Sequence, residues 1–257
     1  MQEIDALKIP SLEPMLEIWQ QTLNWQPNPQ QINRFQQLYT QILQGNRQQN
    51  LTRITSSDEF WEKHLWDSLR GISFSFGQPH PPMSPIHEGA NIIDIGTGAG
   101  FPGIPIAIAH PHAHLTLVDS TQKKITFIQA IATALNLSNI HAIADRAETI
   151  GQNPQHRQQY DFATIRAVSS ITVCAEYCIP LLKINGIACI YRGKWTREEQ
   201  IHLENAVAEL GAEITQIAEF TTPLSHSQRT CIYLRKVTPT PAKYPRNVGI
   251  PSQRPLS

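Results

Sequence analysis

The feature that most constrains the fold is a run of isoleucines that leads directly into a glycine-rich segment, within residues 91–103. Ile92, Ile93 and Ile95 form the short β-branched run that is typical of a strand buried on both faces of a parallel sheet. Three glycines then alternate with other residues, and Pro102 suits the first turn of a helix. The segment therefore predicts a strand, a tight turn and a helix, with bare main chain against which a ligand could lie.

The spacing of these glycines distinguishes two classes of nucleotide cofactor. The dinucleotide fingerprint is Gly-x-Gly-x-x-Gly, whereas here the third glycine comes one residue early and Phe101 occupies the last place. Asp94, two residues before the first glycine, would repel a pyrophosphate but could accept a hydrogen bond from the ammonium of an amino-acid moiety. The pattern is similar to the first motif of Rossmann-like, S-adenosylmethionine-dependent methyltransferases. A tight turn without any ligand is the alternative interpretation.

A second acidic residue ends the next predicted strand. Asp119 lies about 20 residues beyond Gly98, the position from which a carboxylate can accept both hydrogens of a ribose diol. We therefore expect the glycine turn and Asp119 to bind one nucleoside-containing cofactor.

Predicted strands alternate with predicted helices from residue 90 to residue 237. Such alternation implies a parallel, right-handed, doubly wound sheet. Only residues 221–229 separate the last two strands, too few for a crossover helix, so these strands should pair antiparallel. We therefore predict an α/β fold, the Rossmann-like class I methyltransferase arrangement, with a seven-stranded, mostly parallel, doubly wound sheet and an N-terminal helical extension. The predicted strands are 91–95, 114–119, 139–145, 161–165, 186–191, 213–219 and 230–236, and the predicted helices are 102–109, 121–136, 171–182 and 196–210.

Residues 1–89 are predicted to form the helical extension and a Pro/His-rich connection to the main domain. The first residues, 1–13, should fray. A short helix starts near Pro14, and a longer helix follows Pro29 and should stop at Gly45. The connection cannot continue a helix or join a central strand because it is rich in proline. Its prolines are Pro79, Pro81, Pro82 and Pro85.

A third predicted helix in the extension carries a polar pair. His64 and Asp67 share one face of this helix because they stand three residues apart. They form either a polar contact between the extension and the main domain or a pair that faces the cofactor cleft. The sequence leaves both interpretations open.

The charge of the chain is balanced overall but uneven along its length. The formal net charge is zero, yet the residues after Phe220 include six Lys and Arg and no Asp or Glu. The first 220 residues therefore carry a net charge of about −6. A basic C-terminal tail, residues 238–257, suits contact with a polyanion, although an ordinary solvated tail is the alternative.

Composition also argues against several other classes of protein. No apolar run approaches the ~20 residues that span a membrane, and the N-terminus has no signal-peptide pattern. The four cysteines form no Cys-x-x-Cys pair, which favours a reduced cytoplasm over a disulfide framework. His110, His112 and His114 fall in a predicted exposed turn, so we expect no metal site. We expect a cytoplasmic monomer with no membrane partner.

Short motifs spread along the chain match one protein family in combination. They are Asn50-Leu51-Thr52, His64-x-x-Asp67-Ser68, Asp94 to Gly103, Asp119-Ser120, Asp145-Arg146-Ala147-Glu148, Ile165-Arg166-Ala167 and Lys243-Tyr244-Pro245-Arg246. With these motifs the chain resembles the GidB/RsmG family from about residue 30 to the C-terminus. Members of that family are bacterial methyltransferases that modify guanine N7 in small-subunit ribosomal RNA.

The resemblance implies S-adenosyl-L-methionine as cofactor and 16S ribosomal RNA or the small ribosomal subunit as partner, with the 530 loop as the family target. Many relatives carry Lys-Gly after the fifth strand, whereas this chain has Arg192-Gly193, which keeps the charge and adds a planar fork. The predicted cofactor-binding residues are Asp94, Gly96, Gly98, Phe101, Asp119, Ser120, Thr121, Ala147, Glu148 and Arg166. The predicted catalytic residues are Asp67, Arg166 and Arg192, and the predicted RNA-binding residues are His64, Lys243 and Arg246.

The expected mechanism follows from the chemistry of guanine. N7 has an in-plane lone pair and no proton, so its methylation needs no general base, only in-line alignment and the exclusion of water. The segment Arg166–Ser169 lacks the Asn/Asp-Pro-Pro-aromatic motif that serves exocyclic amines, which is consistent with this chemistry. The alternatives are a methyltransferase for a small molecule or a protein, a non-catalytic RNA chaperone that binds the cofactor, and a dehydrogenase.

Overall fold

The computed structural model describes residues 10–49, 52–76 and 86–257. Some sequence predictions lie outside these residues. They are the prolines of the Pro/His-rich connection, the predicted fraying of residues 1–9, and Asn50-Leu51 of the first family motif.

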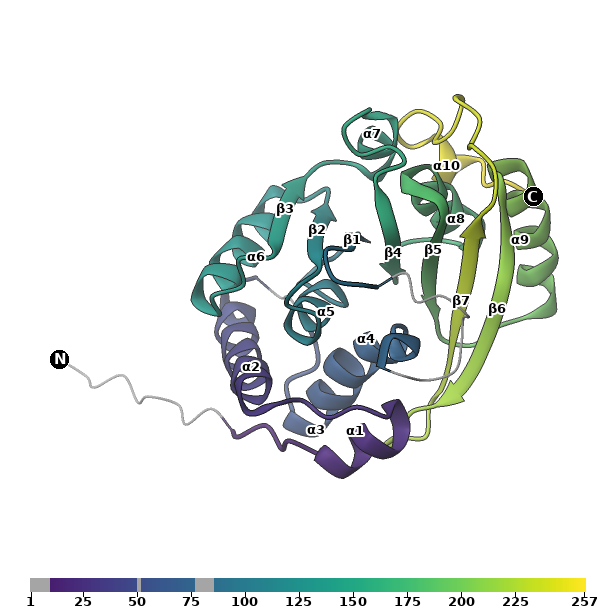
Figure 1. Cartoon of the computed structure of the whole chain (residues 1–257). Coiled ribbons are helices and arrows are strands. Elements are labelled where there is room, and N and C mark those ends of the chain that lie inside the picture. The colour runs from purple at the N-terminus through teal and green to yellow at the C-terminus, as the bar shows by residue number, and fades with distance from the viewer. Residues whose placement is uncertain (1–9, 50–51, 77–85) are drawn as a thin grey trace.

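A seven-stranded sheet in the order β3-β2-β1-β4-β5-β7-β6 forms the centre of the molecule (Figure 1). The first five strands pair in parallel, and β7 pairs antiparallel with both β5 and β6. The predicted fold class is therefore confirmed, including the antiparallel pairing of the last two strands. The strands are β1 (Asn91–Ile95), β2 (His114–Asp119), β3 (Ile140–Ala144), β4 (Tyr160–Arg166), β5 (Leu182–Arg192), β6 (Ala212–Thr221) and β7 (Gln228–Lys236).

Helices cover both faces of the sheet, so the central strands β1 and β4 are buried on both sides. Along β1, Ile92 packs into one hydrophobic core, whereas Ile93 and Ile95 pack into the other. This division follows from the alternation of side chains along a strand. The first core contains α5 (Gly103–Ala109), α6 (Gln122–Ala134) and the N-terminal helices, and the second contains α7 (Ala147–Gln152), α8 (Ile171–Cys178) and α9 (Arg197–Leu210).

The N-terminal extension packs as part of the first core. Its long second helix continues past Gly45 to Gln49, so the predicted stop at Gly45 was wrong. A helical glycine costs only about 1 kcal/mol relative to alanine, and the burial of Phe35, Leu38 and Ile42 on the same helix outweighs this cost. The segments of the extension are α1 (Leu16–Leu23), α2 (Pro29–Gln49), α3 (Ser57–Phe60), η1 (Trp61–Trp66), α4 (Asp67–Arg70) and η2 (Ser73–Phe76).

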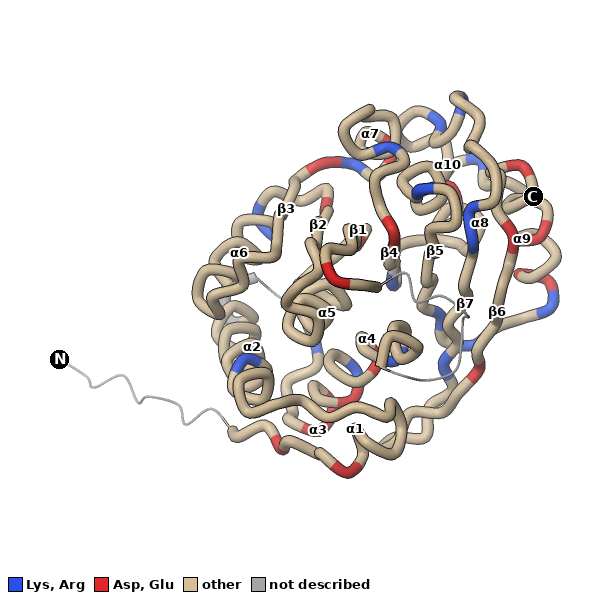
Figure 2. Tube along the Cα trace, viewed as in Figure 1, with Lys and Arg blue, Asp and Glu red and all other residues tan. Residues whose placement is uncertain are grey.

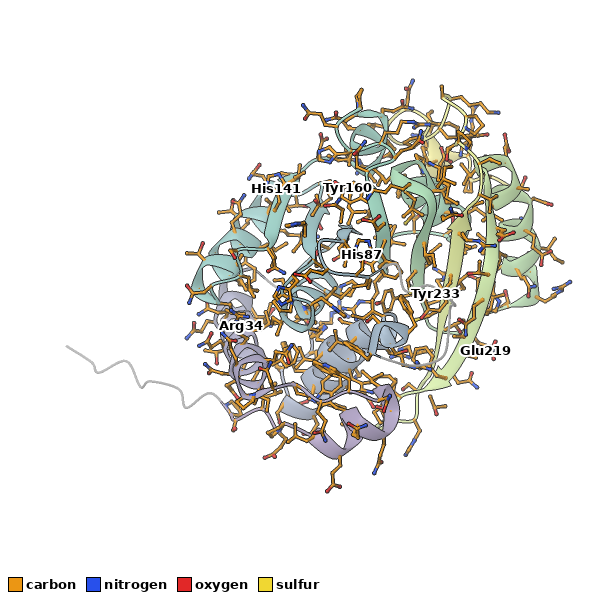
Figure 3. The ribbon with its side chains drawn as sticks, in the orientation of Figure 1. Arg34, His87, His141, Tyr160, Glu219 and Tyr233 are labelled. Carbon is orange, nitrogen blue, oxygen red and sulfur yellow. The ribbon has the colours of Figure 1, made fainter. Side chains whose placement is uncertain are left out.

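The third predicted helix contains one π-helical stretch, η1, between α3 and α4. Two tyrosines of the sheet attach this helix to the main domain. Tyr191 Oη donates to the carbonyl of Ser68 over 2.7 Å, and Tyr233 Oη donates to the carbonyl of Gly71 over 3.1 Å. Figure 3 shows Tyr233 on the side of β7 that faces these helices. The extension is therefore held in one position on the sheet.

Several predicted boundaries in the main domain differ from the structure by a few residues, and one helix was not predicted. Residues 147–152, which lie outside the predicted helices, form α7, a six-residue helix. The predicted helix 171–182 ends at Cys178, and a short 3₁₀ turn, η3 (Ile179–Leu181), leads into β5. Pro180 explains this ending because proline has no N–H to continue the helical hydrogen bonds.

The C-terminal residues 238–257 fold back over the helices of the second core and end in a short helix, α10 (Ile250–Gln253) (Figure 1). Tyr244 and Pro251 are buried, which anchors this segment. Figure 2 shows basic and acidic residues intermingled around α8, α9 and α10. In the described part of the chain, no helix combines the length and the hydropathy needed to cross a membrane.

Candidate active site

The glycine turn lies at the carboxyl edge of the sheet, where β1 separates β2 on one side from β4 on the other. Ligands of open α/β sheets bind at this point. Gly96 has a φ of +68°, and a Cβ atom added to it would lie 2.4 Å from Val168 Cγ2, so only glycine fits. Gly98 has a φ of +62°, and the nearest atom to an added Cβ is 3.9 Å away. The main chain at Gly98 is therefore open to a ligand.

A cavity of about 260 Å³ lies beside this turn. Its lining comes from the ends of β1 and β2, the start of α7, the segment after β4, α8 and the C-terminal segment. The cavity brings together five of the predicted cofactor-binding residues: Gly96, Asp119, Ser120, Ala147 and Glu148. Its lining also includes Val168, Tyr177 and Ser252, which the sequence did not single out as site residues.

Asp119 is fixed at the end of β2 by hydrogen bonds from the glycine turn and from residues that follow β2. Its Oδ2 accepts from the N–H of Gly98 over 3.1 Å and from Lys124 Nζ over 3.2 Å, and its Oδ1 accepts from the N–H of Thr121 over 2.9 Å. A carboxylate has about four acceptor sites in all and three are used here, so capacity for one further donor, such as a ribose hydroxyl, remains. Thr121 contributes here through its main chain.

Glu148 is a buried carboxylate at the start of α7. Its Oε1 accepts from Tyr177 Oη over 3.0 Å and from the N–H of Gly249 over 2.9 Å. Burial alone would raise the pKa of Glu148, but these hydrogen bonds and the charge of Arg146 outweigh burial and lower it. Oε2 has no partner within the described ranges. An unpartnered buried acceptor beside a cavity fits a ligand that carries a hydrogen-bond donor, such as an amino-purine.

Asp94 lies behind the glycine turn and not in the cavity lining. Its Oδ2 accepts from the N–H of Gly103 over 3.0 Å, and its Oδ1 accepts from the hydroxyl of Thr164 over 2.8 Å. The side chain is 1% exposed, and burial raises its pKa to about 6. Asp94 is therefore hydrogen-bonded to helix α5 and to β4, and its carboxylate is exposed neither to solvent nor to the cavity.

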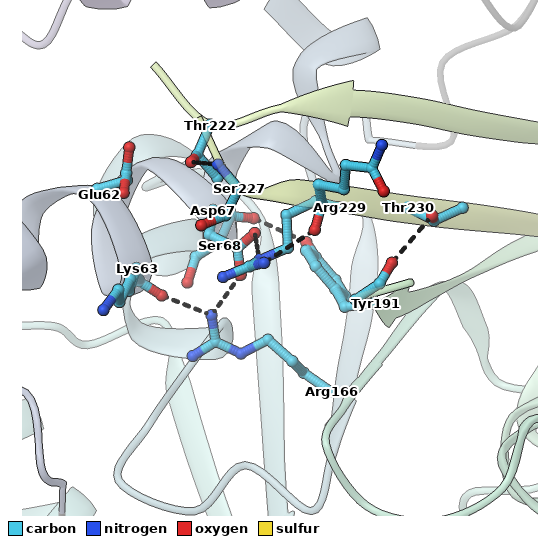
Figure 4. Close-up of polar contacts among 12 residues, drawn as sticks. Glu62, Lys63, Asp67, Ser68, Arg166, Tyr191, Thr222, Ser227, Arg229 and Thr230 are labelled. Carbon is cyan, nitrogen blue, oxygen red and sulfur yellow. Dashed lines mark hydrogen bonds and ion pairs between the residues drawn. The ribbon is translucent and has the colours of Figure 1, made fainter. Parts of the chain in front are cut away.

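A buried polar cluster lies at the end of β4, next to the glycine turn (Figure 4). Arg166 Nη1 donates to the carbonyl of Lys63 over 3.0 Å and to Asp67 Oδ2 over 2.9 Å. Arg229 Nε, from β7, lies 3.9 Å from Asp67 Oδ1. The guanidinium of Arg166 also lies 5.9 Å from the centroid of the Phe101 ring. The N-terminal extension therefore supplies the carboxylate that holds two arginines of the main domain.

His64 packs inside this region. Its ring stacks on Phe101 with 4.2 Å between centroids and an interplanar angle of 9°, and its Nε2 lies 2.9 Å from the hydroxyl of Thr52. Burial, and next the positive charge of Arg166, lower the pKa of His64 to about 3. The ring is therefore neutral at ordinary pH, and it supports the glycine turn through Phe101.

Arg192 does not join the Arg166 cluster. Its Nη1 donates to the carbonyl of Ser169 over 3.0 Å, and its Nη2 lies 2.5 Å from Glu199 Oε1. These contacts tie the end of β5 to the segment after β4 and to α9. The side chain remains about one-quarter exposed at the carboxyl edge.

A second cavity, of about 370 Å³, lies at the same edge between the end of β5 and the β6–β7 hairpin. Lys194, Trp195, Phe220 and Arg229 line it. Because Arg229 also contacts Asp67, this cavity is connected to the Arg166 cluster. Two cations, two aromatic rings and the carboxylate of Glu219 therefore lie beside the Arg166 cluster.

The two predicted RNA-binding residues of the C-terminal segment have different surroundings. Arg246 Nη2 donates to Glu176 Oε2 over 2.6 Å, and its Nε donates to Glu176 Oε1 over 3.0 Å; Glu176 is fully buried. Lys243 pairs with Glu209 over 2.9 Å at the surface, where its side chain is 65% exposed. Arg246 is thus engaged inside the protein, whereas Lys243 stays accessible.

The histidine-rich turn before β2 shows packing contacts. The ring of His110 stacks on Phe76, and its Nε2 lies 2.9 Å from the hydroxyl of Ser75. Among residues 10–49, 52–76 and 86–257, no group of three or more His, Cys, Asp or Glu side chains is arranged to bind a metal ion.

Comparison with known proteins decides the family. Residues 31–231 match the family model described as GidB, rRNA small subunit methyltransferase G. The chain belongs to the GidB family. A curated relative, ribosomal RNA small subunit methyltransferase G of Nostoc punctiforme, is 60% identical over 245 residues, which cover 95% of this chain and 98% of the relative. The protein of the same name from Trichodesmium erythraeum is 54% identical over 247 residues, with 95% and 94% covered.

Membership of the GidB family confirms the resemblance read from the motifs and makes the chain an S-adenosylmethionine-dependent methyltransferase. A solved structure of a variant 16S rRNA (adenine(1408)-N(1))-methyltransferase from Catenulisporales acidiphilia agrees in fold. It is 16% identical, has a TM-score of 0.51, and covers 60% of this chain and 88% of that chain. The glycine backbone, Asp119 and the open oxygen of Glu148 fit S-adenosylmethionine, which carries a ribose diol and an amino-purine.

Proposed function

We propose that this member of the GidB family transfers the methyl group of S-adenosylmethionine to N7 of a guanine in 16S ribosomal RNA. The observation that carries this proposal is the position of Arg166. Its guanidinium lies against Phe101 of the glycine turn and on Asp67, which also contacts Arg229 of the second cavity. A cation held by Asp67 therefore connects the glycine turn to the second cavity, whose cations and aromatic rings suit a nucleotide of the substrate.

The chain's own residues would orient the guanine instead of removing a proton from it. Bound S-adenosylmethionine supplies the methyl group from a sulfonium, and N7 attacks with a lone pair that needs no base. Arg166 has donors suited to guanine O6, beside N7 on the major-groove edge. Methylation leaves a positive charge on the base, and the carboxylate of Asp67 is the nearby group that would stabilise it.

The second cavity is proposed to take RNA next to the target base. Single-stranded RNA is commonly recognised by aromatic side chains that stack on bases and by cations that contact phosphates. Trp195 and Phe220 supply the rings, and Lys194 and Arg229 supply the charges. We also propose that Lys243, which is exposed, contacts the RNA backbone.

Methyl transfer from labelled S-adenosylmethionine tests the proposal. We expect label in 16S ribosomal RNA, free or in the small subunit, taken from a strain that lacks the modification, and little label in the same RNA from a modified strain. Absence of label from both RNAs, with label in a protein or a small molecule, would refute the proposal and favour the alternative substrate classes.

A further inference from the structure

The C-terminal segment, residues 244–256, borders the cofactor cavity. Ser252 of α10 lines the cavity together with Tyr177 of α8 and Glu148 of α7. Tyr177 Oη lies 3.3 Å from Ser252 Oγ and 3.0 Å from Glu148 Oε1. Three elements that are far apart in the sequence therefore meet at one end of the cavity, and α7, α8 and α10 lie together in Figure 1.

The carboxylate of Glu148 joins the segment to the cavity. Glu148 is 2% exposed, and a buried carboxylate requires hydrogen-bond donors. The segment provides one of them, the N–H of Gly249, at 2.9 Å from Oε1. Because Oε2 has no partner among the described residues, the same carboxylate retains capacity for a ligand in the cavity. Loss of the segment would remove a donor from a residue that lines the site.

A second buried carboxylate fixes the start of the segment. The main-chain N–H, Nε and Nη2 of Arg246 all donate to Glu176, over 2.8, 3.0 and 2.6 Å. Removal of one partner of a buried ion pair strongly destabilises the structure around it. Arg157 Nη1 also donates to the carbonyl of Tyr244 over 2.6 Å, and Gln152 Nε2 donates to the carbonyl of Pro245 over 2.5 Å. The segment is thus attached to α7, α8 and the α7–β4 connection by its own contacts.

We propose that residues 244–256 are part of the S-adenosylmethionine site, with Ser252 as a cofactor contact and Arg246 as the positioning residue that holds the segment in place. The inference rests on the cofactor of the GidB family and not on the identity of the methyl acceptor. It gives Arg246 a role in cofactor affinity, in contrast to the RNA contact expected from charge alone.

Calorimetric titration of the full chain with S-adenosylmethionine tests the role of Ser252. Ser252→Leu should raise the Kd of the cofactor about tenfold or more, because the larger side chain fills space at the end of the cavity. RNA affinity, measured by filter binding, should change less than about twofold because no proposed RNA contact is altered. Arg254→Ala is the matched control, since it shortens an exposed side chain of the same segment that does not line the cavity, and it should leave the cofactor Kd unchanged.

Hydrogen exchange together with titration tests the role of Arg246. Arg246→Ala should reduce the protection of amides in residues 247–253 and raise the cofactor Kd about tenfold. Arg246→Ala leaves the buried charge of Glu176 unpaired, which could destabilise the whole chain. The double variant Arg246→Gln/Glu176→Gln is the control, because its uncharged pair should keep the chain folded and recover much of the affinity for S-adenosylmethionine. Wild-type cofactor affinity in both Ser252→Leu and Arg246→Ala would overturn the proposal. Failure of the wild-type chain to methylate ribosomal RNA, with normal cofactor binding, would refute the proposed function alone.

Discussion

The buried carboxylate of Asp94 should make the free energy of unfolding of this protein depend on pH. The isosteric substitution Asp94→Asn should remove the part of this dependence that comes from Asp94. Both oxygens accept hydrogen bonds, from the N–H of Gly103 and from the hydroxyl of Thr164. In Asp94→Asn, the amide oxygen can keep the bond from Gly103, and the amide NH₂ can donate to the Thr164 oxygen. The hydroxyl of Thr164 can then turn toward the carbonyl of Ile93, 3.5 Å away. The variant therefore keeps the hydrogen-bond network and loses only the titratable group.

The magnitude follows from the pKa of Asp94, which burial raises from 3.8 to about 6. The folded state binds the proton more tightly than the unfolded chain, so the free energy of unfolding falls as pH rises from 3.8 toward 6 and is level above that. The full difference is about 3 kcal/mol, since one pKa unit is worth about 1.4 kcal/mol. Between about pH 5 and about pH 7.5 the wild-type chain should lose about 1.4 kcal/mol through this group.

Urea unfolding of both proteins across this range measures the effect. The difference in unfolding free energy, Asp94→Asn minus wild type, should grow by about 1.4 kcal/mol from about pH 5 to about pH 7.5. Asp94→Ala is the control, and it should be destabilised by about 1–3 kcal/mol because it leaves the donors of Gly103 and Thr164 without an acceptor. The cofactor Kd of Asp94→Asn should stay close to that of the wild type because the carboxylate faces no cavity. Parallel pH curves for the two proteins would refute this account of Asp94.

Three further predictions concern the glycine turn and the polar cluster. Gly98→Ala should weaken cofactor binding about tenfold in calorimetry, because its methyl group meets open space where the ligand approaches; unchanged affinity would contradict the cavity assignment. Arg166→Lys should lower rRNA methylation about 10–100-fold, with a smaller change in cofactor Kd, because lysine cannot bridge the Lys63 carbonyl and Asp67 with one planar group. The NMR ring signals of His64 should stay constant from about pH 5 to about pH 8, since the pKa of His64 in the folded protein is about 3. Because the unfolded chain binds this proton more tightly, the free energy of unfolding should fall as pH falls below about 6.5. An NMR titration midpoint near 6.5 for the His64 ring would be inconsistent with the buried stack on Phe101.

The central part of the fold could be predicted because its signals are local. The isoleucines of β1 and the alternating glycines fix a strand and a turn within a few residues, and β1 runs from Asn91 to Ile95 as expected. The helix α7 was missed because it has only six residues, too few for a helical pattern of apolar positions to emerge. The π-helical stretch η1 likewise has no sequence signal of its own and depends on how the extension packs on the sheet.

The candidate site could be predicted only where its residues adjoin the strand ends. Asp119 ends β2 and Glu148 comes shortly after β3, so the fold itself brings them to the cavity. Arg229 and Ser252 were missed because they arrive from the antiparallel hairpin and from the C-terminal segment. The partner of Arg246 is Glu176, 70 residues away, and charge counting cannot reveal such a pair. The excess of basic residues was the available signal, and it pointed toward a polyanion.

The most direct test of the proposed reaction is to map the methylated base. Ribosomal RNA from a strain that lacks the modification is incubated with the protein and S-adenosylmethionine, then treated with borohydride and aniline, which cleave the chain at N7-methylguanine, and read by reverse transcription. We predict one cofactor-dependent stop, at a guanine of the 530 loop, that is lost in Arg166→Lys. Incorporation of methyl groups into RNA that resists this cleavage, or a stop at another kind of base, would contradict transfer to guanine N7.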